Sequence, residues 1–103
     1  MLKIKLFCNA GMSTSMLVTK MRNSAKERNL DVEITAFPES KLEKETDDCD
    51  VALLGPQVKF LLGRAKKICD PKGIPVAAIN IQDYGLMKGE KVLNMAMKMF
   101  EEK

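Results

Sequence analysis

The chain has 103 residues, of which 46% are hydrophobic, and its 17 basic and 14 acidic residues give a net charge of +3. This length predicts a single domain, residues 1–103, with an adequate core of its own. The basic residues are scattered and do not alternate with aromatic residues, which argues against a nucleic-acid partner. Because the sequence has neither a membrane-spanning apolar stretch nor a signal peptide, we expect a cytoplasmic protein.

Three cysteines and no histidine limit the chemistry open to this chain. Cys8, Cys49 and Cys69 form no C-x-x-C pair, and no metal-ligand spacing is present. We therefore expect free thiols and neither a metal nor another cofactor. Without histidine, the chain has no Cys-His nucleophile pair and no phosphohistidine of its own. A reactive cysteine must then be activated by its local backbone or by a partner.

Strand patterns alternate with helix patterns along the chain. Apolar runs that predict strands occupy residues 2–8, 32–36, 51–54 and 75–79. A helix pattern follows each run. Apolar residues recur at helical spacing in residues 14–28, in 56–69 and from about Leu86 onward, and a short polar helix is expected around 39–46. This order predicts an α/β fold, with a four-stranded parallel sheet of order 2-1-3-4, right-handed crossovers and helices on both faces.

Individual residues mark where these elements begin and end. Ser13 is a candidate N-cap of the first helix, and Asn29 suits its end, where left-handed geometry is common. Pro38 stops the second strand, which has the alternating pattern of a sheet edge, and Pro56 suits the first turn of the third helix. We expect the segment 80–85 to be a loop.

Lys3 and Lys5 alternate along the first strand, which the predicted order places in the middle of the sheet. Charged side chains are unfavourable beneath a layer of helices. We therefore expect both lysines to lie near a rim that no helix covers and to extend their charges to water.

Cys8 stands where the first strand ends, and a loop of small residues follows it and opens a helix. Ligands of parallel α/β sheets bind beyond the carboxyl ends of the strands, at the switch point beside the first strand. Backbone N–H groups of such a loop converge on an anion, and the helix dipole adds positive potential. Both features favour a thiolate and can hold a phosphoryl group on the sulfur. We therefore predict that Cys8 is reactive, whereas Cys49 and Cys69 are structural.

The loop after Cys8 supplies the candidate phosphate contacts. They are Asn9, Ala10, Gly11, Met12, Ser13, Thr14 and Ser15. Three consecutive hydroxyls exceed what a helix cap needs, so we expect at least one of them to contact phosphate. Met12 suits a transient docking surface because its side chain is flexible and apolar. Tyr84, after the fourth strand, is either half-buried packing or part of the site.

The run from Cys8 to Ser15, with Leu54-Gly55-Pro56-Gln57-Val58 after the third strand, closely resembles the lactose/cellobiose-type enzyme IIB of the bacterial phosphoenolpyruvate-dependent sugar phosphotransferase system. The strand-helix order matches over essentially the whole chain.

This resemblance implies that Cys8 accepts a phosphoryl group from a phosphohistidine on enzyme IIA. Cys8 then passes it to a sugar in the membrane permease, enzyme IIC, and that sugar is expected to be a β-linked disaccharide such as cellobiose or chitobiose. We expect a monomer that acts transiently at the inner face of the membrane. Met12, Gln57 and Tyr84 are its candidate partner contacts.

A low-molecular-weight tyrosine phosphatase is the strongest alternative, because it has a similar sheet and a cysteine loop in the same place. That family has an arginine where this chain has Thr14, and it uses a late aspartic acid for which Asp83 is a loose candidate. Loss of the guanidinium suits a relay that preserves its phosphocysteine. A thiol redox protein needs Cys49 or Cys69 to approach Cys8 in space. A receiver domain is discounted, since it needs acidic residues at the ends of strands 1 and 3.

Overall fold

The computed structural model describes residues 1–9 and 12–103, and the side chains of all of these except Met12 and Ser13. Its strands are β1 (Leu2–Cys8), β2 (Val32–Pro38), β3 (Val51–Leu54) and β4 (Val76–Ala78). Neighbouring strands are parallel and lie in the order β2-β1-β3-β4. This confirms the predicted strand order, with β2 at an edge and β1 in the interior of the sheet.

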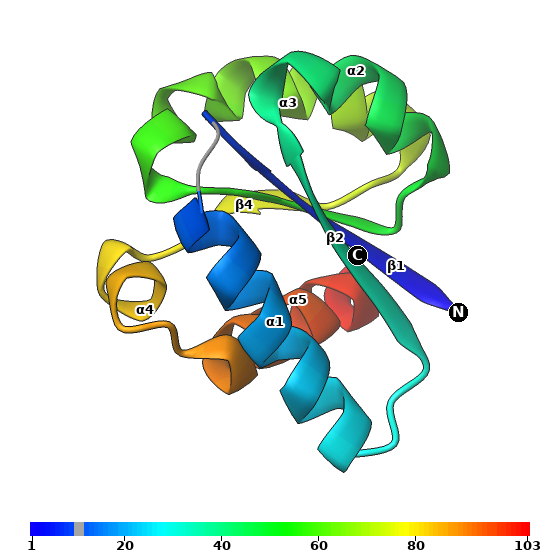
Figure 1. Ribbon diagram of the computed structural model, residues 1–103. Coiled ribbons are helices and arrows are strands. Elements are labelled where there is room, and N and C mark those ends of the chain that lie inside the picture. Colours follow the sequence, from blue (N-terminus) through cyan, green and yellow to red (C-terminus); the bar gives the residue numbers. More distant parts are fainter. Residues whose placement is uncertain (10–11) are drawn as a thin grey trace.

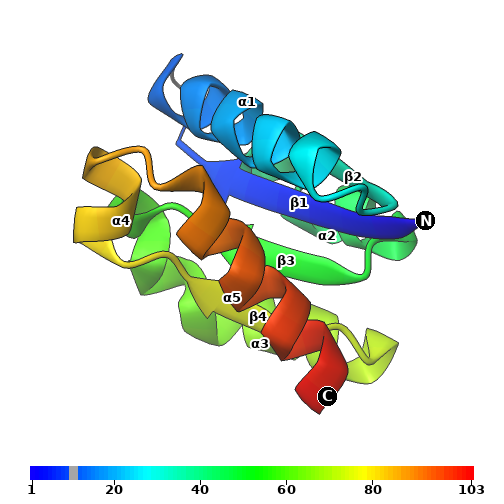
Figure 2. The ribbon, with the colours of Figure 1, turned by 90° about the horizontal axis from the view of Figure 1, so that it is seen from below.

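Helices cover both faces of this sheet. The described helices are α1 (Met12–Glu27), α2 (Leu42–Glu45), α3 (Leu62–Cys69), α4 (Ile81–Gly85) and α5 (Gly89–Glu102), with 3₁₀ turns η1 (Glu39–Lys41), η2 (Thr46–Asp48), η3 (Pro56–Leu61) and η4 (Asp70–Lys72). Helices α1 and α5 lie on one face, and α2 and α3 lie on the other (Figure 1). The turned view in Figure 2 also places α4 at the end of the molecule where α1 begins.

Each face of the sheet packs against its own apolar cluster, as β3 illustrates. Val51 and Leu53 belong to the cluster beneath α1 and α5. Ala52 and Leu54 belong to the cluster beneath α3. Side chains alternate between faces along a strand, and all four of these residues are 0% exposed. A continuous apolar run is therefore what a strand covered on both faces requires.

Helix α1 begins at Met12, two residues before the predicted start, and it ends at Glu27. Ser13 therefore lies in the first turn and not at the N-cap. Serine and threonine suit both places, so the sequence does not separate them. Asn29 has a φ of 54°, which confirms its predicted left-handed conformation after the helix.

The predicted helix over 56–69 is divided in two. Val58 has non-helical angles, with φ −120° and ψ 22°, and regular α-helix begins only at Leu62. A tight turn precedes the break, because the Val58 N–H donates to the Gly55 carbonyl at 3.0 Å. The predicted apolar stripe is nevertheless correct, since Val58 and Ala65 are buried and Leu62 packs against the same cluster.

The segment after β4 is helical, so the loop predicted over 80–85 is wrong. Asn80 caps α4, because its Oδ1 accepts the backbone N–H of Gln82 at 2.8 Å and that of Asp83 at 3.4 Å. Asparagine at this position is a recognised helix-start signal. The helix is too short to show apolar periodicity, which hid the signal.

The closing helix α5 begins at Gly89 and not near Leu86. Met87 has a φ of 54°, and this left-handed residue reorients the chain between α4 and α5. Gly89 then packs directly on α1, where a Cβ atom would lie 2.5 Å from the backbone carbonyl carbon of Lys20. Glycine is needed there for a close helix-helix contact, which no local sequence pattern reveals.

Lys5 does not lie at an uncovered rim, so the expectation is wrong for this residue. Lys5 is 6% exposed, and its Nζ donates to the Glu45 carbonyl at 3.0 Å and to the Glu45 carboxylate at 3.2 Å. Lys3 is more exposed and pairs with Asp48 at 2.6 Å. The α2–η2 segment supplies both acids and covers this part of the sheet.

Candidate functional site

Cys8 is the last residue of β1, and only 3% of it is exposed. The chain leaving β3 passes close to it, because the Gly55 N–H donates to the Phe7 carbonyl at 2.8 Å. A Cβ atom on Gly55 would lie 3.0 Å from the Cys8 sulfur. Glycine therefore permits β3 to end beside the thiol. The sulfur thus sits at the carboxyl edge of the sheet, next to its central strand.

Three polar side chains surround the Cys8 sulfur. Sγ lies 3.4 Å from Asn9 Oδ1 and 3.5 Å from Gln57 Oε1. The hydroxyl of Tyr84 is 3.8 Å away. An amide group can turn either its oxygen or its nitrogen toward a neighbour. Asn9 and Gln57 can therefore accept a hydrogen bond from a thiol, and donate one to a thiolate or a phosphoryl oxygen.

Thr14 and Tyr84 form a buried hydroxyl pair beside the sulfur. Thr14 Oγ1 and the Tyr84 hydroxyl are 2.7 Å apart, and the two residues are 4% and 5% exposed. Burial raises the pKa of Tyr84, while the hydrogen bond from Thr14 opposes that rise. Tyr84 therefore stays protonated and able to donate. The structure places it inside the site, which leaves little of its surface for contact with a partner.

The other predicted phosphate contacts are described to different extents. The Asn9 side chain is exposed at the end of β1, and the Ser15 side chain is exposed on α1. Met12 and Ser13 are described by their backbone only. Ala10 and Gly11 lie outside the described residues. The cradle of loop N–H groups accordingly stays a prediction.

Cys49 and Cys69 lie far from Cys8, near the amino ends of the strands. The Cys49 thiol donates to the Val51 carbonyl at 3.1 Å, and burial raises its pKa to about 11. Its sulfur also lies 4.0 Å from the carbonyl of Lys3, five residues before Cys8 on β1. At about 3.3 Å per residue, this separates the two thiols by more than about 10 Å. Burial also raises the pKa of Cys69. Cys49 is thus too distant to act as a resolving thiol for Cys8.

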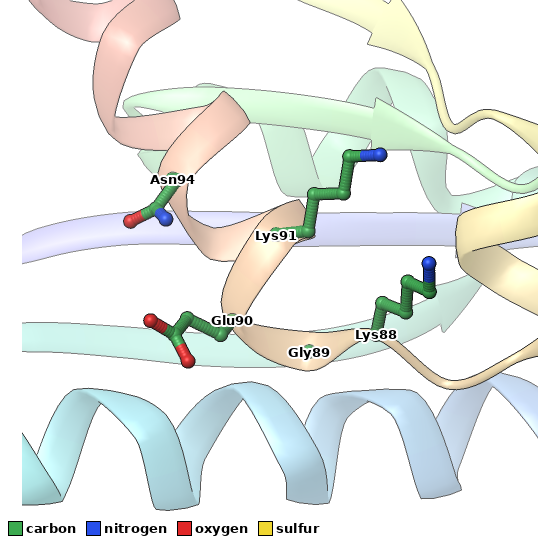
Figure 3. Close-up of a pocket in the computed structure, with 5 residues that line it drawn as sticks. All are labelled: Lys88, Gly89, Glu90, Lys91 and Asn94. Carbon is green, nitrogen blue, oxygen red and sulfur yellow. The ribbon is translucent and has the colours of Figure 1, made fainter.

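A hollow of about 460 Å³ lies over the first turn of α5 (Figure 3). Its lining residues are Lys88, Gly89, Glu90, Lys91 and Asn94. In Figure 3 the two lysine side chains extend to the opposite side from Glu90. Lys91 is already paired with Asp83 at 3.3 Å. The lining groups do not converge on one point, and the hollow is separate from Cys8.

Asp83 is the candidate general acid of the phosphatase alternative. Its carboxylate is engaged by the ion pair with Lys91.

The described part of the chain has neither a cluster of metal ligands nor a membrane-spanning helix. Within residues 1–9 and 12–103, no three His, Cys, Asp or Glu side chains gather as metal ligands would. In the same residues, no helix combines the length and the apolar character needed to cross a membrane.

Comparison with known proteins identifies the family of this chain. The family model for the lactose/cellobiose-specific IIB subunit of the phosphotransferase system (PTS) matches residues 3–95. The chain belongs to this family. This identifies it as a phosphotransferase component of sugar transport, as the sequence predicts. IIB components of this system work with IIA and IIC components.

Relatives of this IIB component match over nearly their whole length. It is 44% identical to the PTS galactose-specific EIIB component of Lactococcus lactis subsp. cremoris, over 90% of this chain and 91% of the relative. It is 43% identical to the PTS cellobiose-specific EIIB component of Lactococcus lactis subsp. lactis, with the same coverage. The solution structure of the cellobiose-specific phosphotransferase IIB component from Borrelia burgdorferi superposes with a TM-score of 0.83 at 47% identity, over 99% of this chain and 94% of that one.

The structure adds two features of this IIB site that sequence reasoning missed. One is the close contact between Gly55 and the sulfur, since the Gly-Pro pattern by itself indicates only a turn. The other is the contact between Thr14 and Tyr84, which lie 70 residues apart in the chain. For Tyr84 the sequence does contain one signal, which is Asn80. As an N-cap residue, Asn80 indicates the start of the helix that carries Tyr84.

Proposed function

We propose that this IIB domain carries a phosphoryl group on Cys8, from a phosphohistidine of enzyme IIA to a sugar bound by enzyme IIC. The position of the Cys8 sulfur carries the proposal. It lies at the carboxyl end of the central strand, beside the start of α1, among neutral groups that can donate hydrogen bonds. The chain has no histidine, so the phosphohistidine belongs to the partner.

The first transfer begins when the Cys8 thiol loses its proton to solvent. The thiolate attacks the phosphorus of the phosphohistidine in line with the bond to nitrogen. The S–P bond forms as the P–N bond breaks, and the electron pair of the broken bond stays on the imidazole nitrogen. Cys8 then holds the phosphoryl group as a phosphocysteine.

The second transfer regenerates the thiolate. A sugar hydroxyl oxygen attacks the phosphorus, so that an O–P bond forms, the S–P bond breaks and the sulfur keeps the electron pair. The hydroxyl proton passes to a base on enzyme IIC or to solvent. Both steps require in-line positioning and stabilisation of the equatorial phosphoryl oxygens. The amides of Asn9 and Gln57, the Thr14 hydroxyl and the backbone N–H groups of residues 9–15 are our candidates for that role.

The surface around Cys8 supports docking of protein partners. Large apolar side chains are exposed on three elements that follow strand ends, namely Met16 at 55%, Phe60 at 78% and Ile81 at 72%. The start of α1, η3 and α4 carry them, and Figures 1 and 2 both place these elements at one end of the molecule. Because the sulfur is almost fully buried, a donor must approach closely, and an apolar rim favours such a contact.

For the sugar, we propose a β-linked disaccharide such as cellobiose or chitobiose. The support comes from the cellobiose-specific relative and the cellobiose-specific solved structure. The domain is proposed to act as a monomer at the cytoplasmic face of the membrane, where enzyme IIC presents the sugar. Phosphorylation assays with membranes that contain the matching IIC, comparing cellobiose, chitobiose and galactose, test this assignment.

Intact mass measurement tests the carrier role. After incubation with phosphoenolpyruvate, the upstream phosphotransfer proteins and enzyme IIA, the chain should gain one phosphate, and Cys8→Ser should gain none. Cys49→Ser is the matched control and should be phosphorylated like the wild type. Phosphate found on another residue would refute the proposal. Rapid release of inorganic phosphate without IIC would instead support the phosphatase alternative.

A further inference from the structure

The Tyr84 hydroxyl contacts residues of two other elements beside the Cys8 sulfur. Its hydroxyl is 2.7 Å from Thr14 Oγ1, on α1, and 3.8 Å from Cys8 Sγ, on β1. Tyr84 itself comes from α4, which follows β4. One phenol therefore contacts groups that lie 70 and 76 residues away in the chain.

Contacts of the backbone and of neighbouring residues in α4 hold Tyr84 in place. Its backbone N–H donates to the Asn80 carbonyl at 3.0 Å, and the Asn80 side chain caps the same short helix. The next residue before it, Asp83, is held by Lys91. The ring belongs to the apolar cluster beneath α1 and α5 and is 5% exposed. The hydroxyl consequently has a defined place at the edge of the site.

The two hydroxyls hold two hydrogens between them, and their mutual bond uses only one. The second hydrogen can be donated to a third group. The Cys8 sulfur lies 3.8 Å from the Tyr84 hydroxyl and can accept the hydrogen of Tyr84 when Thr14 donates to the phenol oxygen. A phosphoryl group on the sulfur would bring acceptor oxygens to the same place, and such oxygens only accept hydrogen bonds.

We propose that Thr14 is a positioning residue, which holds the Tyr84 hydroxyl so that the phenol donates one hydrogen bond to the sulfur, and to a phosphoryl oxygen once Cys8 is phosphorylated. The second half of this inference rests on the proposed function. The first half concerns the free thiol and does not. An aromatic ring alone would fill the same space, so packing does not explain the hydroxyl.

A double-mutant cycle tests the hydroxyl pair. Tyr84→Phe keeps the ring and removes the hydroxyl, and Thr14→Val keeps the shape of Thr14. Two rates are measured for the wild type, both single variants and the double variant, namely iodoacetamide alkylation of Cys8 and phosphoryl transfer from phosphorylated IIA. Each single change should slow both rates by about three- to tenfold. The double variant should be no slower than either single one, because the pair acts as a unit.

Two further variants separate this role from a general structural one. Thr14→Ser restores the hydroxyl and should recover most of both rates. Thr19→Val is the control, since the Thr19 hydroxyl lies on the same helix and donates to the Ser15 carbonyl at 3.1 Å. It should keep wild-type rates.

The outcomes distinguish the hydroxyl pair from the carrier role. Wild-type rates in Tyr84→Phe, or losses that multiply in the double variant, would overturn the hydroxyl pair. If the alkylation rates are coupled but IIA does not phosphorylate the wild-type chain, the pair stands and the carrier role fails. If Cys8 is phosphorylated but neither rate is coupled, the carrier role stands and the pair fails.

Discussion

The two ends of the sheet use polar residues in opposite ways. At the amino end, three lysines are each paired with an acid, Lys3 with Asp48, Lys5 with Glu45 and Lys72 with Asp47. At the carboxyl end, the side chains within reach of Cys8 are neutral, namely Asn9, Gln57 and Tyr84 with its partner Thr14. At the amino end the charged groups are paired with one another. At the carboxyl end the neutral groups form hydrogen bonds that can reorient toward a new partner.

This difference suggests that residues at the amino end contribute to stability, whereas residues at the carboxyl end contribute to phosphoryl transfer. A lysine that is already paired with a carboxylate binds an incoming anion only weakly, because its positive charge is largely neutralised. An amide or hydroxyl can turn its donor toward a phosphoryl group and turn back when the group leaves, at small energetic cost. Burial raises the pKa of the Cys49 thiol to about 11, so this thiol stays protonated near neutral pH. Changes at the two ends should therefore affect different measurements.

The largest expected effect is at the carboxyl end, from Gly55→Ala. The Gly55 backbone, with φ −62° and ψ 152°, accepts alanine, but the new methyl group would lie 3.0 Å from the Cys8 sulfur. Displacement of the sulfur should slow phosphoryl transfer from IIA by about 10- to 100-fold, measured by quenched-flow mass analysis. The control is Gly63→Ala in α3, where nothing lies within 4 Å of a Cβ. It should keep full activity and raise stability by up to about 1 kcal/mol.

The next effect is at the amino end, from Glu45→Gln. Lys5 keeps a neutral acceptor but loses its counter-charge, and its side chain is only 8% exposed. Urea unfolding should show a loss of about 1–2 kcal/mol, which is below the cost of breaking a fully buried pair because Glu45 is 26% exposed. Phosphoryl transfer at Cys8 should be unchanged. Glu43→Gln, on an exposed position of the same helix, should alter neither quantity.

A smaller effect concerns pH and Cys49. The folded thiol titrates at about 11, above its ordinary value of 9.0. Between these values the unfolded chain loses the proton and the folded chain keeps it, so the free energy of unfolding falls as pH rises through this window. Below pH 9 the contribution is complete. Wild type should therefore lose stability relative to Cys49→Ala between about pH 9 and pH 11 in chemical unfolding. Parallel curves for the two proteins would contradict this.

The smallest effect is expected from Asp48→Asn, which breaks the pair with Lys3. The hydrogen bond to Lys3 lowers the pKa of Asp48, yet both groups are in contact with solvent. Exposed pairs of this kind contribute little. The melting temperature should change less than in Glu45→Gln, and the difference from wild type should shrink further in high salt. A loss as large as that of Glu45→Gln would mean that the amino end acts as one connected network.

The amino-acid sequence by itself determined the order of elements and the place of the thiol that we propose as the phosphoryl carrier. Alternating apolar periodicities predict strands and helices, since each residue's face depends on its near neighbours. The strand order, the edge position of β2 and the left-handed Asn29 follow from such local rules. Cys8 at a strand exit, followed by a small-residue loop, placed the candidate site in the same way.

Only the tertiary structure decided which distant groups meet. Tyr84 reaches Thr14 across 70 residues, and Lys5 reaches Glu45 across 40. Gly89 meets the backbone of Lys20 where α5 crosses α1. No local pattern encodes these contacts, because they depend on how whole elements pack after each has formed. The sequence thus predicts where the Cys8 sulfur lies, whereas the packing of whole elements determines which side chains surround it.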